Sequence, residues 1–156
     1  IDRNNLSQTR GALIDRLHHL DQDITGSLTR HDPGVASIVQ GAIERTTLPN
    51  RWLDTLRGID HSEVLLPGKG LVSNANMTAL IDYLIEQIEQ GAQGDTALNL
   101  QSLVGALGER ASLISRIKED LRLVTLTRIW LTIHIPLAFA AVAAVIIHVI
   151  AVFLYW

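Results

Sequence analysis

The last 28 residues of the chain, 129–156, form an uncharged apolar run that constrains the fold more than any other feature. A helix needs roughly 20 apolar residues to cross a bilayer, so the run is long enough for one span. All 13 basic and 16 acidic side chains lie at or before Arg128. The sequence therefore predicts a charged, water-facing segment followed by one C-terminal transmembrane helix.

The flanks of this run predict its position and orientation in the membrane. Trp130 stands near its start and Tyr155 and Trp156 at its end, and such aromatic side chains prefer the two membrane–water interfaces. Basic residues precede the run from Arg110 to Arg128 and none follows it. Because cytoplasmic flanks are enriched in Lys and Arg, we expect a single-pass protein of a bacterial inner membrane with its soluble part in the cytoplasm. The polar N-terminus shows no signal peptide, so we expect the anchor to be retained.

The soluble part is predicted to be helical. Apolar residues recur at spacings of three, four and seven between Leu6 and Leu28. Asp32 followed by Pro33 is typical of a helix start. We expect residues 48–70 to be a loop-rich connector with one short helix, and Asn74 or Asn76 to begin the next helix.

A long final helix is expected to begin at Asp95 or Thr96. Its apolar residues follow a seven-residue repeat that only Arg110 interrupts, which favours a coiled coil or a bundle seam. The alternative is that these side chains pack against the protein's own earlier helices. The repeat consists of Leu100, Leu103, Leu107, Ile114, Ile117, Leu121 and Val124.

The predicted fold class is therefore all-α, in three parts. Residues 1–95 form a helical soluble segment, 96–128 an amphipathic stalk helix, and 129–156 the transmembrane helix that continues it.

Composition excludes several kinds of site. The chain has no cysteine, which rules out disulfides, thiolate metal sites, iron–sulfur ligation and covalent haem attachment. The net charge of −3 argues against nucleic acid as a partner. No pattern resembles a nucleophile–base arrangement or a hydrolytic carboxylate pair, so we do not expect catalysis by this chain alone.

Two histidines, His134 and His148, interrupt the apolar run. Histidine inside a membrane span is costly and uncommon, so each is a candidate functional residue. Fourteen positions at about 100° per residue return to nearly the same helix face, roughly 21 Å further along the axis. The spacing places two imidazoles on one stripe at two depths, which suits two haem irons better than one small site.

The segment from His134 to His148 resembles the haem-ligating helices of dihaem b-type membrane cytochromes. The resemblance implies that each histidine supplies one axial ligand to a different haem. In that family two such helices supply four imidazoles, whereas this chain has one span. The second ligands would therefore come from another copy or another subunit. We expect a homodimer with two haems b that transfers electrons across the membrane, with further membrane or redox subunits and quinone as a redox partner.

Two alternatives remain open at this stage. The chain could be a non-redox anchor and dimerisation scaffold whose histidines are satisfied by a neighbouring helix. It could instead bind a chlorophyll-type pigment through His148.

Two weaker signals have simpler explanations. Asp15 and His19, four apart on one helix face beside His18, could hold a metal but are most simply a solvated face. Pro67 to Gly70 could bind a phosphate but lacks the full glycine-rich motif and is most simply a turn.

Overall fold

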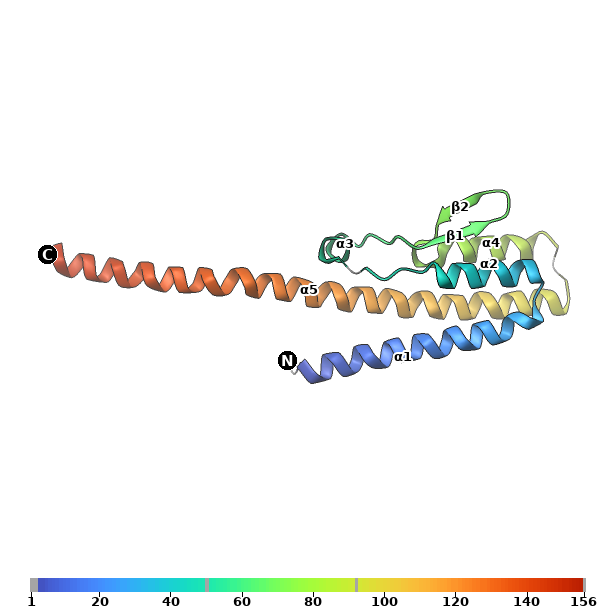
Figure 1. The fold of residues 1–156 in the computed structure, drawn as a ribbon, viewed down its shortest axis with the longest axis horizontal. Helices are drawn as coiled ribbons and strands as arrows, with labels where there is room; N and C mark the ends of the chain where they lie inside the picture. Colours follow the sequence, from blue (N-terminus) through green and yellow to red (C-terminus); the bar gives the residue numbers. More distant parts are fainter. Residues whose placement is uncertain (1–2, 50, 92, 156) are drawn as a thin grey trace.

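The structure, a computed structural model, describes residues 3–49, 51–91 and 93–155 and is largely helical (Figure 1). The predicted helical fold with one long C-terminal helix is confirmed. In chain order the elements are α1 (Arg3–Ser27), η1 (Leu28–Arg30), α2 (Pro33–Glu44), α3 (Trp52–Arg57), β1 (Glu63–Leu66), β2 (Gly70–Ser73), η2 (Ala75–Met77), α4 (Thr78–Glu89) and α5 (Asp95–Tyr155).

Helix α5 is a single helix of 61 residues, roughly 90 Å long. It begins at Asp95, whose carboxylate suits the first turn because the helix dipole is positive there. The helix continues across Pro136 without a break in its assignment. Its most apolar 18-residue window has a mean hydropathy of 2.8, so α5 is long and apolar enough to cross a membrane. About half of it projects beyond the soluble body (Figure 1).

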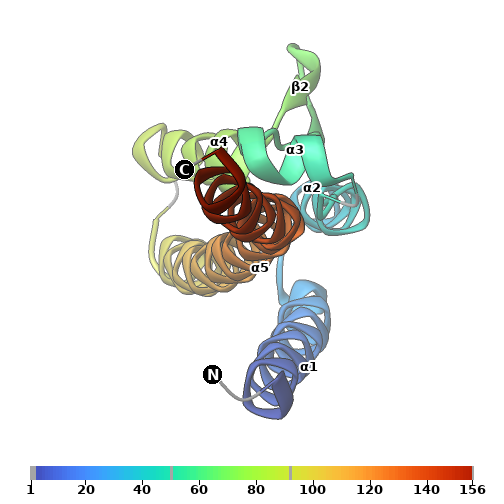
Figure 2. The same cartoon turned by 90° about the vertical axis from the view of Figure 1, so that its left-hand side faces the viewer.

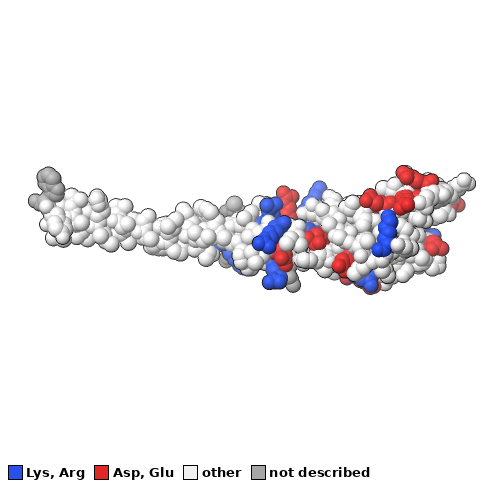
Figure 3. Space-filling view, turned by 90° about the horizontal axis from the view of Figure 1, so that it is seen from above, with Lys and Arg blue, Asp and Glu red and all other residues white. Residues whose placement is uncertain are grey.

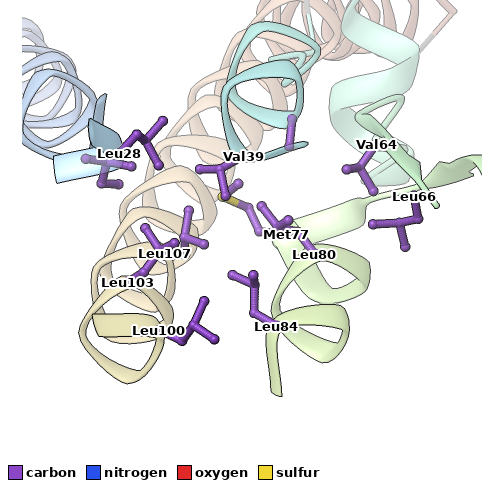
Figure 4. Close-up of a cluster of buried hydrophobic side chains, with 12 residues drawn as sticks. Leu28, Val39, Val64, Leu66, Met77, Leu80, Leu84, Leu100, Leu103 and Leu107 are labelled. Atoms are coloured by element: carbon purple, nitrogen blue, oxygen red, sulfur yellow. The ribbon is translucent and has the colours of Figure 1, made fainter. Parts of the chain in front are cut away.

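The core of the body forms around the first half of α5. Helix α1 runs alongside α5 in the opposite direction, and α4 also packs on α5 (Figure 1). Leu100, Leu103 and Leu107 of α5 lie in one cluster with residues of α1, α2, β1 and α4 (Figure 4). Over residues 100–117 the structure therefore shows the second alternative for the repeat, packing against the protein's own helices.

This packing makes the start of the expected stalk part of the soluble body. Ile24 of α1, Val39 of α2 and Leu84 of α4 are buried in the same core as the leucines of α5. Fully burying a Leu or Ile side chain contributes about 1.5–3 kcal/mol, so these contacts are the main stabilising contribution in the body. The side chain of Leu6, also expected on the apolar face of α1, lies outside the described side chains.

The connector contains an antiparallel hairpin that the sequence patterns did not predict. Val64 and Leu66 of β1 are buried and alternate with exposed residues. Pro67 and Gly68 turn the chain, with Gly68 at φ 75° and the N–H of Lys69 donating to the carbonyl of Leu66 over 3.3 Å. Proline followed by a residue with positive φ is the pattern of a type II turn. The sequence Pro67 to Gly70 is thus the turn of a hairpin.

The expected helix starts are confirmed with one refinement. Asp32 Oδ2 accepts a hydrogen bond from the N–H of Gly34 over 2.8 Å and caps α2. Asn74 Oδ1 accepts from the N–H of Leu80 over 3.1 Å, in the first turn of α4. Asn74 therefore caps α4 from before the 3₁₀ turn η2, rather than from the residue immediately preceding the helix.

Arg110, the interruption in the apolar repeat, forms a buried ion pair. Its side chain is 3 % exposed, and Nε and Nη2 donate to the two carboxylate oxygens of Asp21 over 2.6 and 3.2 Å. Nη1 also donates to Thr46 Oγ1 over 3.0 Å. A buried guanidinium requires such partners because removing charge from water is costly. The pair joins α1 and the segment after α2 to the face of α5.

We expect Asp21→Ala to destabilise the body by about 3 kcal/mol or more, because it leaves the guanidinium of Arg110 buried without its carboxylate. Glu109→Ala is the matched control: it breaks the exposed Arg16–Glu109 pair, which should cost less than about 1 kcal/mol. Chemical denaturation in detergent, followed by circular dichroism, measures both. If both variants lost the same small amount of unfolding free energy, the Asp21–Arg110 pair would not be important for stability.

Candidate functional site

The two histidines of the apolar run lie on the projecting half of α5, beyond the soluble body. Both side chains are exposed, as are all residues from 131 to 150. The continuous helix keeps His134 and His148 on nearly the same face, roughly 21 Å apart along the axis. The arrangement expected from the spacing is thus present within one element. No other described segment of the chain covers it.

His134 has an aromatic neighbour one turn earlier on the same face. The rings of Trp130 and His134 are stacked, with centroids 4.4 Å apart and planes inclined by 12°. Positions four apart on a helix are neighbours, which allows this contact. The indole limits the orientations open to the imidazole of His134. His148 has Ala144 at the equivalent earlier position, so the two histidines have different local environments.

Small side chains form part of the surface around the histidines, beside larger ones such as Leu137 and Val145. The small side chains occupy positions three, four or seven residues from one or other histidine, where helix geometry places neighbours on the same side. A side chain that ends at Cβ lets a flat ring approach the backbone closely. The positions are Ala138, Ala141, Ala144 and Ala151.

A second polar cluster lies where the soluble body meets the projecting half of α5. Lys118 Nζ donates to Asp60 Oδ2 over 2.5 Å, and the two side chains are 19 % and 9 % exposed. The N–H groups of Ser62 and Asn76 also donate to the carboxylate of Asp60, over 2.9 and 3.1 Å. Asp60 therefore links the segment before β1, the turn η2 and helix α5. The sequence patterns placed Asp60 only in a loop.

The pKa of Asp60 reflects this environment. Burial raises the pKa of the carboxyl, but the hydrogen bonds from Lys118, Ser62 and Asn76 outweigh burial and lower the pKa from 3.8 to about 2. Asp60 is therefore charged at neutral pH. Its role is structural, since its bonding partners are on this chain.

A cleft of about 700 Å³ lies at the opposite end of the body, against the start of α5. Its polar lining includes Arg30, His31, Tyr83 and Asn99. Burial and the charge of Arg30 lower the pKa of His31, which favours the neutral imidazole. The carboxylate in the lining, that of Asp32, caps α2.

The weaker sequence signals remain separate from the histidine pair. Asp15, His18 and His19 are exposed on α1. Among the described residues, no three His, Cys, Asp or Glu side chains gather in a group that could hold a metal ion. Trp156, expected at the far membrane interface, lies outside the described residues.

Comparison of the chain with protein-family models, with curated proteins and with solved structures finds no match.

The lowered pKa of Asp60 predicts the acid sensitivity of the body. Because the pKa is about 2 in the folded state and 3.8 ordinarily, the charged carboxylate stabilises the fold above about pH 4, and this contribution is lost as the pH falls towards 2. Asp60→Asn should lower stability at pH 7 and reduce the loss between pH 4 and pH 2. Denaturation at a series of pH values measures both effects. The exposed Asp82→Asn on α4 is the control, and identical pH profiles for the wild type and Asp60→Asn would contradict the assignment.

Proposed function

We propose that the chain is a membrane electron-transfer subunit that binds b-type haem through His134 and His148. The observation that carries the proposal is the placement of two exposed imidazoles, 14 residues apart, on nearly the same face of one uninterrupted apolar helix. Histidine in a span usually faces a partner, a cofactor or a water-filled cavity. His134 and His148 are about four helical turns apart, so each could ligate a different haem iron at its own depth in the membrane.

The residues present fit the group that the resemblance implies. Imidazole nitrogen is an axial ligand of haem iron, and within the described chain neither histidine has a hydrogen-bonding partner. The alanines around them leave room for a flat ring. Bound haem supplies reversible one-electron chemistry at its iron.

A single copy would leave each iron one histidine short. The described part of the chain contains one helix able to span a membrane, so a second such helix must supply the opposing imidazoles. A parallel homodimer about a two-fold axis places like histidines opposite each other. This arrangement would also cover part of the apolar surface that the lone helix exposes. A different subunit carrying a similar pair is the other source of the ligands.

The chain's own residues would bind and orient the group at both levels. Trp130 would hold the imidazole plane of His134 at the membrane edge, whereas His148 would be oriented by its partners across the interface. The apolar side chains of the span would exclude water from both levels. The Asp60–Lys118 cluster would fix the soluble body to α5 directly before the span.

A reduced-minus-oxidised absorption spectrum of the full chain, purified in mild detergent from its native membrane, tests the proposal. We expect the sharp α and Soret bands of six-coordinate b-type haem, at about one haem per chain for the shared dimer. His134→Ala and His148→Ala should each remove the absorbance of one haem while the protein still inserts. His18→Ala, on the exposed face of α1, is the matched control and should leave the spectrum unchanged.

The possible results separate the proposal from its rivals. Intact protein without haem bands would refute it and leave a membrane anchor or scaffold. A chlorophyll-type spectrum that depends on His148 would assign pigment binding. Haem bands unaffected by either substitution would mean that other residues hold the haem.

A further inference from the structure

The short helix α3 lies across α5 at the end of the soluble body nearest the apolar span. In Figure 1, α5 runs horizontally and α3 is seen almost end-on. In Figure 2, which looks along α5 from its C-terminal end, α3 is seen from the side. The two views together show that α3 runs across the direction of α5. Thr55 and Gly58 share a cleft with Ser115 and Arg122 of α5. Arg122 and Ser115 are seven and fourteen residues before the apolar run, or roughly 10 and 21 Å of helix rise. Helix α3 therefore lies about parallel to the plane of a membrane that α5 crosses.

Helix α3 exposes large apolar side chains at this level. Trp52 is 58 % exposed and Leu53 is 39 % exposed, whereas Thr55, one turn after Trp52, is buried against the body. Leaving an indole in water forfeits much of its burial energy. The headgroup region of a bilayer is the environment that Trp prefers.

Arginines lie next to α3 in the sequence and on the adjoining part of α5. Arg51 and Arg57 flank α3, and Arg122 and Arg128 follow on α5. All four are exposed. Figure 3 shows Lys and Arg gathered, with some acidic residues, where the charged body gives way to the uncharged helix. The acidic residues of α3 and of the adjoining segments are Asp54, Asp60, Glu119 and Asp120, and Asp60 is already paired with Lys118.

We propose that α3 lies on the membrane surface and binds anionic lipid headgroups through Arg51 and Arg57, with Trp52 and Leu53 inserted among them. Exposed tryptophan and leucine with arginines beside them are residue types that segments bound at a membrane surface use. Anionic lipids attract each nearby Arg or Lys electrostatically. The inference requires that α5 crosses the membrane and does not depend on haem. Its consequence is a second contact that fixes the orientation of the soluble body against the bilayer.

Site-directed spin labelling tests this contact, since the chain contains no cysteine. Single nitroxides are attached to Leu53→Cys on α3, to Leu65→Cys on the exposed face of β1 and to Phe139→Cys in the span. The full chain is reconstituted in vesicles of phosphatidylcholine with phosphatidylglycerol. Collision rates with oxygen, which enters lipid, and with a nickel chelate, which stays in water, are then measured. We expect the oxygen-to-nickel ratio at position 53 to exceed that at position 65 several-fold.

The charge requirement has its own control. Arg51→Gln with Arg57→Gln, or vesicles of phosphatidylcholine alone, should move the ratio at position 53 towards that at position 65. Equal ratios at positions 53 and 65 in anionic vesicles would overturn the proposal. A label at position 53 that is shielded from both reagents would also overturn it, because a protein then covers α3. A water-like label at position 139 would overturn the premise that α5 spans the membrane, and the spectrum of bound haem is measured separately.

Discussion

The structure depends on one continuous helix whose two halves have different surroundings. The first half of α5 buries Leu100, Leu103 and Leu107 against the body, and the second half exposes apolar residues on all sides. In a bilayer every backbone N–H and C=O must be satisfied within the segment, which a helix achieves by itself. The same backbone can therefore continue from the water-facing body into lipid. Only the side chains change, from one apolar stripe to apolar residues all round.

The basic side chains of α5 become more exposed towards its apolar half. Arg110 is buried and held by Asp21, whereas Lys118 lies nearer the span and is held by Asp60. The basic residues after Lys118, Arg122 and Arg128, are exposed. No charged residue follows Arg128. The buried pairs position α1 and the connector on α5, and the exposed arginines remain free for solvent or lipid headgroups. The ion pairs thus fix the body to the first half of α5, and the histidine pair lies in the uncharged apolar half.

Much of the fold was predictable because its signals are local. The cap at Asp32, the start of α5 at Asp95 and the apolar length of the span depend on adjacent residues, and all were predicted. The hairpin was missed because each strand has four residues and because the Pro67–Gly68 turn was read as part of a connector. Arg110 was visible as a break in the repeat, but its partner is 89 positions away in the chain. No local pattern identifies such a partner.

The sequence by itself determined that one helix is long and apolar enough to span a membrane, and that His134 and His148 lie on nearly one face of it. The reason is that helix geometry converts spacing along the sequence directly into direction and axial distance. The proposal that these histidines bind haem also comes from the sequence, because it rests on their spacing of 14 residues. Only the tertiary structure decided that the leucines of α5 are used inside the chain, that Asp60 and Lys118 meet, and that Trp52 is exposed beside the span. The physical reason is that these features depend on packing between segments distant in sequence. Periodicity shows which face of a helix is apolar, but it does not show what that face will contact.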